Sequence, residues 1–184
     1  GVDQKLRNRV GCLLEKLVFR ELFEFRTMQS DPNFANYLYR PEDGKIVLLD
    51  FGSSVTFEKE FTERYARISR ALIDDDHDAA VHYAEKIGYL DSGNSPEHIE
   101  RVMNMIRMVC EPICHVGIYD FYHSDVFARA RDAGFEMVFK GTGEFKAPPP
   151  STAFLHRKLA GSFLLCARIK ACVNVQELIE PHLP

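Results

Sequence analysis

Two acidic residues and an asparagine have the types and spacing that metal-assisted phosphoryl transfer needs. Asp31 is followed by four residues and then Asn36, and Asp50 opens the triplet Asp50-Phe51-Gly52. Where a γ-phosphoryl group is transferred from ATP, one Asp at such a spacing orients the acceptor, while an Asn and a second Asp hold Mg²⁺. The sequence therefore predicts Asp31 as the catalytic group and Asn36 and Asp50 as metal ligands.

Oxygen ligands are what this chemistry requires. Mg²⁺ prefers an octahedron of oxygens, of which a carboxylate and an amide can supply two while phosphates and water supply the rest. A γ-phosphoryl group in transfer needs positioning and charge neutralisation more than covalent help. We therefore expect Mg²⁺ and ATP or ADP as cofactors, with Asn36, Asp50, Phe51 and Gly52 beside the nucleotide. A simpler alternative stays open, in which Asp31 caps a turn and Asp50 starts a loop.

A β-hairpin is the element expected to position these residues. Asn36 precedes the short run 37–39, and Asp50 ends the apolar run 46–49. The turn-forming residues Pro41-Glu42-Asp43-Gly44 lie between the two runs. Pairing of the runs would bring Asp31, Asn36 and Asp50 to one end of the hairpin.

Helical periodicity dominates the rest of the chain. Apolar residues recur at helical spacing in a first long segment that leads directly into Asp31, and Ser95-Pro96 and Ser151 have the form of helix starts. We see no internal repeat or linker, so residues 1–184 are expected to form one mainly helical lobe with a small β-hairpin. The predicted helices span residues 4–28, 57–73, about 77–90, 96–112, 125–133 and 152–171.

Composition excludes several classes of protein. The chain has 184 residues, a formal net charge of −4 and a hydrophobic fraction of 46%. The absence of a basic excess argues against nucleic acid as a partner. No apolar stretch approaches the roughly 20 residues that span a bilayer, so no transmembrane segment is predicted. The five cysteines are odd in number and lie mostly in apolar contexts, which favours reduced thiols.

Two clusters of polar residues invite a functional interpretation. Cys110, Cys114 and His115 could suggest a metal site, but Pro112 interrupts the segment and no second ligand pair follows. The basic run 156–158 could contact phosphate or lipid headgroups. Because the apolar stripe of its helix leaves these positions outside, we expect the run to face solvent.

Four segments resemble the UbiB/ADCK family of atypical kinases, most closely its mitochondrial coenzyme Q branch. They are residues 22–36, residues 48–52, the prolines at 148–150 and residues 155–163. The resemblance implies the C-terminal lobe of a protein-kinase-like fold, Mg²⁺-dependent nucleotide binding, ATPase activity and support of ubiquinone biosynthesis. It also implies a mitochondrial location at the matrix side of the inner membrane, with peripheral membrane association. The implied partners are a lipid or isoprenoid small molecule and other coenzyme Q biosynthesis proteins.

Departures from ordinary protein kinases narrow the expectation. Gln29-Ser30 replaces the usual His-Arg before the catalytic Asp, and Asn33 stands where protein kinases carry a phosphate-facing lysine. No Ala-Pro-Glu element follows Gly52. These differences argue against a peptide acceptor and favour ATP hydrolysis or a small or lipid-like acceptor.

Several parts of a working kinase are missing from the chain. Residues 1–8 cannot supply a Gly-rich loop or the lysine–glutamate pair of an N-terminal lobe. We therefore expect a fragment of a longer protein, with weak activity on its own.

Three classes of function remain open at this stage. The first is an atypical kinase or ATPase, in the manner of the family. The second is a non-catalytic, pseudokinase-like scaffold in a lipid-biosynthesis complex. The third is a small-molecule phosphotransferase, which shares the arrangement of Asp31, Asn36 and Asp50 but not the residues around them.

Overall fold

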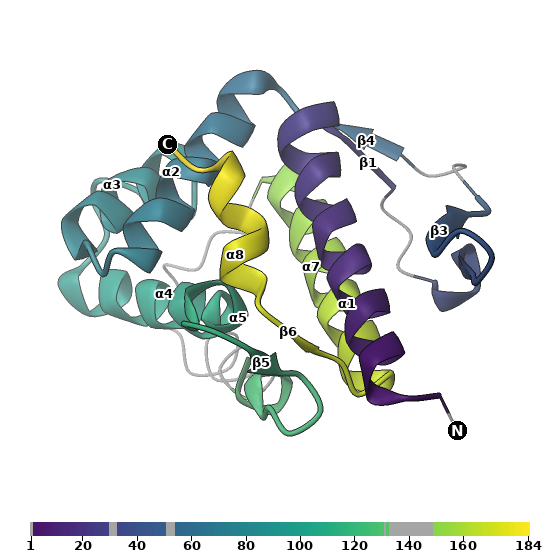
Figure 1. Cartoon of the computed structure of the whole chain (residues 1–184). Helices are drawn as coiled ribbons and strands as arrows, with labels where there is room; N and C mark the ends of the chain where they lie inside the picture. Colours follow the sequence, from purple (N-terminus) through teal and green to yellow (C-terminus); the bar gives the residue numbers. More distant parts are fainter. Residues whose placement is uncertain (1, 30–32, 51–53, 131, 133–148) are drawn as a thin grey trace.

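The structure is a computed structural model that describes residues 2–29, 33–50, 54–130, 132 and 149–184. It is mainly helical, and its described strands form three small antiparallel pairs (Figure 1). The first half contains α1 (Gln4–Phe19), η1 (Arg20–Phe25), β1 (Thr27–Gln29), η2 (Phe34–Asn36), β2 (Tyr37–Arg40), β3 (Lys45–Leu48), β4 (Ser54–Thr56), α2 (Lys59–Ile73) and α3 (His77–Ile87). The second half contains α4 (Pro96–Val109), α5 (Glu111–Cys114), β5 (Tyr119–Asp120), α7 (Pro150–Arg168), β6 (Cys172–Val173), α8 (Val175–Ile179) and η3 (Glu180–His182).

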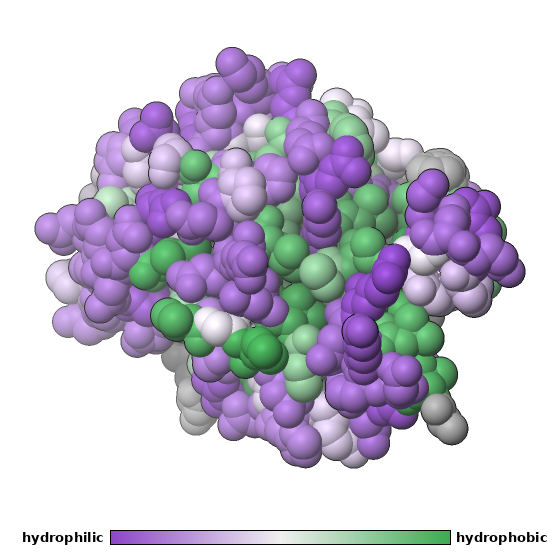
Figure 2. Space-filling view, in the orientation of Figure 1, coloured by the Kyte–Doolittle hydropathy of each residue, from purple (hydrophilic) through white to green (hydrophobic). Residues whose placement is uncertain are grey.

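Helices α1 and α7 lie side by side at the centre of the lobe (Figure 1). The carboxylate of Asp3 caps α1 by accepting a hydrogen bond from the Leu6 amide. Helix α1 buries Leu14 and Val18, and α7, which packs against it, buries Leu155 and Leu159. The helical stripe predicted for the first segment is therefore core on this side. On the face shown in Figure 2, apolar surface flanks a polar ridge along α1, so the rest of the stripe is only partly covered.

Gly11 allows the chain's C-terminal segment to approach α1 closely. A Cβ atom at Gly11 would lie 2.6 Å from the Cβ of Ala171 and 3.0 Å from Cγ2 of Val173. Over-packing of this kind costs about 1–3 kcal/mol, while alanine gains up to about 1 kcal/mol in helix propensity. We expect Gly11→Ala to lower the free energy of unfolding by about 1 kcal/mol in urea titrations. Gly93→Ala, which has open space around it, is the control, and an equal effect of both would contradict the packing argument.

The prediction for the first helix is wrong at its C-terminal end. The helix changes to a π-helix at Arg20, stops at Arg26, whose φ is +51°, and the chain continues as strand β1. Strand β1 pairs antiparallel with β4, with Met28 opposite Val55. The pairing buries Met28 and places the buried Glu21 within reach of the strand. A π-turn inserts an extra residue into a helix and so changes which side chains face inward.

The helix starts of the middle region agree with the predictions from sequence. Asp76 accepts a hydrogen bond from the Ala79 amide at the start of α3, and Ser95 caps α4 in the same way with Pro96 in its first turn. Gly88 ends α3 in the left-handed conformation. Helices α2 and α3 pack against each other at the left of Figure 1.

Helix α7 differs from its prediction in two respects. It begins at Pro150 after Pro149, so Ser151 is a helical residue and not the cap. Phe154, predicted to be core, is 38% exposed. Leu155, Leu159, Phe163 and Cys166 are buried as predicted.

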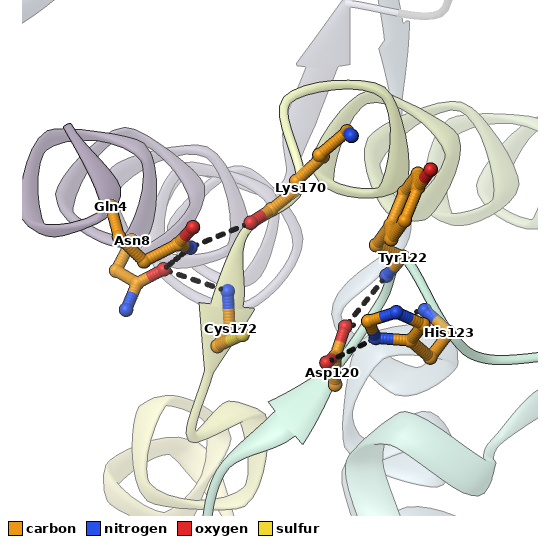
Figure 3. Close-up of polar contacts among 7 residues, drawn as sticks. All are labelled: Gln4, Asn8, Asp120, Tyr122, His123, Lys170 and Cys172. Carbon is orange, nitrogen blue, oxygen red and sulfur yellow. Dashed lines mark hydrogen bonds and ion pairs between the residues drawn. The ribbon is translucent and has the colours of Figure 1, made fainter. Parts of the chain in front are cut away.

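Polar contacts fasten the segment that follows α7 to the start of α1 (Figure 3). Gln4 Nε2 donates to the Lys170 carbonyl at 2.7 Å, and the Cys172 amide donates to Asn8 Oδ1 at 2.9 Å. Strand β6 then pairs with β5, so that Tyr119 lies opposite Val173. These contacts hold the start of α1, the segment after α7 and β5 together.

No helix in the described ranges is both long and apolar enough to cross a bilayer. All five cysteines are free thiols, two of them buried. Burial raises the pKa of Cys114 to about 11, so this thiol stays protonated at neutral pH.

Candidate magnesium–nucleotide site

The predicted hairpin forms and brings Asn36 close to Asp50. Strands β2 and β3 pair antiparallel with Tyr37 opposite Leu48, and the Leu49 amide donates to the Asn36 carbonyl at 3.0 Å. Asn36 is only 8% exposed, whereas Asp50 is exposed. The backbone therefore holds an amide side chain and a carboxylate at one end of the hairpin.

The remaining predicted site residues, Asp31, Phe51 and Gly52, lie outside the described residues. Their roles stay predictions. The described residues on either side of these segments nevertheless meet. Gln29 lies opposite Ser54 in the β1–β4 pair, and Gln29 Nε2 donates to the Asp50 carbonyl.

The far end of the hairpin is a compact turn. Gly44 has φ +65°, and its amide donates to the Arg40 carbonyl at 2.9 Å. The guanidinium of Arg40 beside Asp43 holds the pKa of that carboxyl well below its usual range. Asp43 is exposed, and it lies in the turn, at the opposite end of β2 and β3 from Asn36 and Asp50.

The ligand types fit Mg²⁺. An amide oxygen and a carboxylate are hard oxygen donors, and the exposure of Asp50 leaves the carboxylate accessible to a metal that also binds phosphate and water. The pairing of Leu49 with Asn36 fixes the separation of the two backbones. The hairpin can thus supply two protein ligands to one cation.

Lys158 contradicts the prediction that residues 156–158 face solvent. It is 2% exposed, whereas Arg157 is exposed as expected. Its ammonium nitrogen lies 2.9 Å from Glu21 Oε2 in an ion pair. The same nitrogen donates to the Gln29 carbonyl at 3.0 Å and to Tyr37 Oη at 2.9 Å.

His156 is also largely inside the lobe. Its ring stacks on Tyr89 with centroids 5.6 Å apart, and Nε2 lies 2.6 Å from Tyr89 Oη. Burial lowers the pKa of His156 to about 4. The imidazole is therefore neutral at physiological pH and serves packing, not phosphate binding.

A second buried acid between α1 and α7 was not anticipated from sequence. Glu15 is fully buried, and its Oε1 accepts hydrogen bonds from Ser162 Oγ at 2.5 Å and from Cys166 Sγ at 3.3 Å. Its other oxygen has no hydrogen-bond partner among the described residues. Burial raises the pKa of Glu15 to about 7. Its helical position resembled that of an ordinary exposed glutamate.

The segment that contains the candidate site residues matches a family of known proteins. The family model described as the ABC1 atypical kinase-like domain matches residues 3–84, a range that contains Asp31, Asn36 and Asp50.

Relatives match nearly the whole chain. The mitochondrial atypical kinase COQ8B of Rattus norvegicus is 38% identical over 184 residues, covering 98% of this chain and 34% of the relative. The mitochondrial atypical kinase COQ8 of Schizosaccharomyces pombe is 35% identical over 183 residues, covering 98% of this chain and 30% of the relative. The chain thus spans about a third of the length of these relatives.

A solved structure supports the fold. The complex of Rv3197 with erythromycin from Mycobacterium tuberculosis superposes with a TM-score of 0.72 at 22% sequence identity, covering 99% of this chain and 44% of that chain. At this identity the likeness establishes the fold alone. It confirms the predicted class, a mainly helical kinase-like lobe with a small β-hairpin, to which the structure adds two further antiparallel strand pairs.

Proposed function

Because the chain belongs to the ABC1 atypical kinase-like family, we propose that it is the Mg²⁺–nucleotide-binding lobe of an atypical kinase or ATPase. The observation that carries the proposal is the junction of Asn36 and Asp50 at one end of the β2–β3 hairpin. These two residues supply oxygen ligands of the type that Mg²⁺ takes beside phosphates.

Each site residue has a proposed role. Asn36 and Asp50 hold the cation, and Phe51 and Gly52 follow Asp50 beside the nucleotide. Asp31 orients the attacking hydroxyl or water and accepts its proton. Bound Mg²⁺ would offset the charge on the phosphate oxygens. The protein's own contribution is to hold these groups in place before the nucleotide arrives.

The biological setting is proposed from the relatives, which are named mitochondrial atypical kinases COQ8 and COQ8B. We place the protein in mitochondria, at the matrix side of the inner membrane, where it supports coenzyme Q biosynthesis. Its partners there are other proteins of that pathway and a lipid or isoprenoid small molecule. Peripheral association with the membrane fits a protein that acts on such a partner.

The first test is thermal unfolding with ATP and Mg²⁺, against ATP with a chelator. A ligand that binds only the folded state at about a hundred times its Kd stabilises it by about 2.7 kcal/mol, which raises Tm by several degrees. We expect this Mg²⁺-dependent rise in the unsubstituted chain and its loss in Asp50→Ala.

Asp43→Ala is the matched control, because Asp43 is also an acidic residue of the hairpin but lies at the opposite end. It should keep the rise in Tm. If nucleotide stabilises neither the chain nor the full-length gene product, the lobe is a scaffold and the proposal is wrong. Phosphate transferred to an added small alcohol would instead assign the protein to the small-molecule phosphotransferases.

A further inference from the structure

Lys158 connects three elements that surround the candidate site. Its ammonium group pairs with Glu21 of η1 at 2.9 Å and donates to the Gln29 carbonyl of β1 at 3.0 Å and to Tyr37 Oη of β2 at 2.9 Å. An ammonium has three N–H donors, and three oxygens surround this one. The three elements come from the first quarter of the chain and Lys158 from α7, more than a hundred residues later.

Glu21 orients the same strand from the other side. Its Oε1 accepts a hydrogen bond from the Gln29 amide at 3.2 Å, while its Oε2 pairs with Lys158. Both backbone polar groups of Gln29 are thus held by this buried pair. The side chain of Gln29 in turn donates to the Asp50 carbonyl. Three contacts therefore fix Gln29, which stands two residues before Asp31 in the sequence.

Stability alone does not account for this arrangement. Burying two charges costs as much free energy as their attraction returns, and apolar replacements of a buried ion pair are often neutral or stabilising. One of the three contacts of Lys158 is also a hydrogen bond to a backbone carbonyl, that of Gln29, which an apolar side chain could not make.

We propose that Lys158 is a positioning residue for the phosphoryl-transfer site. By fixing the Gln29 carbonyl it holds the chain on which Asp31 stands, and Glu21 keeps the ammonium in place. The inference rests on the proposed function, because positioning matters only if Asp31 takes part in turnover.

The metal ligands also have an attachment that does not involve Lys158. The Leu49 amide donates to the Asn36 carbonyl within the hairpin itself, and Asp50 is the residue after Leu49. Removing the Lys158 contacts should therefore disturb the orientation of the acceptor more than the binding of the nucleotide. The expected signature is a fall in kcat with little change in nucleotide affinity.

The test uses the full-length gene product with the double substitution Glu21→Gln/Lys158→Met. This variant removes both buried charges, while the side-chain carbonyl introduced at position 21 can still accept a hydrogen bond from the Gln29 amide. We expect kcat for ATP hydrolysis to fall at least about tenfold and the Kd for Mg²⁺–ATP to change less than about threefold. Amide hydrogen exchange should become faster in the peptide around Gln29, but not in α2 or α3.

Arg157→Met is the control, since Arg157 is the exposed neighbour on the same helix. It should leave kcat, Kd and exchange unchanged. If the variant Glu21→Gln/Lys158→Met fails to fold, Glu21→Gln/Lys158→Gln replaces it. Its amide side chain at position 158 is shorter than that of lysine and cannot reach all three acceptors.

The outcomes separate this inference from the proposed function. If the unsubstituted protein is active and the folded double variant is equally active, the positioning role of Lys158 is wrong, while the proposed function stands. A parallel loss of kcat and Mg²⁺–ATP affinity would also overturn it, because the effect would then be general. An unsubstituted protein that neither binds nor hydrolyses Mg²⁺–ATP would overturn both.

Discussion

Lys158→Met alone should lower the free energy of unfolding by about 3–5 kcal/mol. The substitution leaves Glu21 charged and buried, with its carboxylate deprived of the ammonium that lies 2.9 Å away. It also removes the donor to the Gln29 carbonyl. For a lobe of this size, such a loss is a large part of the total stability.

Urea titration at about pH 7 measures this change. Adding Glu21→Gln to Lys158→Met should recover most of the lost stability, because the double variant no longer buries an unpaired charge. Lys59→Met is the matched control: its side chain is 75% exposed and pairs with Glu63 at the surface. That control should change the free energy of unfolding by less than about 0.5 kcal/mol. A Lys158→Met variant as stable as the control would show that the buried pair is not formed.

Glu15→Gln should make the protein more stable at alkaline pH and change the dependence of stability on pH. Burial raises the pKa of Glu15 from 4.5 to about 7 in the folded state. Between these two values the folded state binds more protons than the unfolded state, so stability falls as pH rises. The full cost, reached above about pH 7, is on the order of 3 kcal/mol.

Glutamine removes this cost and can still accept a hydrogen bond from Ser162 Oγ. We therefore expect Glu15→Gln to exceed the unsubstituted protein in stability by up to about 3 kcal/mol at about pH 8, and to match it near pH 4. Unfolding in urea at both pH values gives the comparison. Glu63→Gln, at an exposed position, should show no such difference between the two pH values. Equal stability of Glu15→Gln and the unsubstituted protein at the alkaline pH would contradict the raised pKa.

His156 acts in the opposite direction, which is why the comparison is made at each pH. Its pKa is lowered from 6.5 to about 4 by burial, so the unfolded state binds more protons in that interval. The stability contributed by the neutral ring is lost as pH falls below 6.5. Subtracting the free energy of unfolding of the unsubstituted protein from that of Glu15→Gln at the same pH removes this shared contribution.

Local patterns determined much of the lobe. The hairpin depends on two short apolar runs and a turn with Gly44 between them, all within fourteen residues from Tyr37 to Asp50. The starts of α3 and α4 depend on Asp76 and Ser95, each of which caps an amide three residues later. Because partners so close in sequence meet in any compact fold, residue type and spacing were enough to predict them.

Distant pairing decided what the sequence alone could not. The change from helix to strand at Arg26 depends on β4, which meets β1 across a separation of more than twenty residues. Before that partner is known, the apolar stripe of residues 4–28 favours a continuous helix. Tertiary pairing overrode the local preference.

The buried charges show the same division. By sequence, Glu15, Glu21 and Lys158 are ordinary charged residues of amphipathic helices, which in most proteins face solvent. Only the packing of α7 against α1 and η1 determines that they are inside, where burial raises the pKa of Glu15 to about 7 and Glu21 is paired with an ammonium. The sequence by itself thus determined the family, the hairpin and the ligands proposed for Mg²⁺. The tertiary structure decided what holds the chain beside them, because the cost of burying a charge depends on partners that the fold brings from far along the chain.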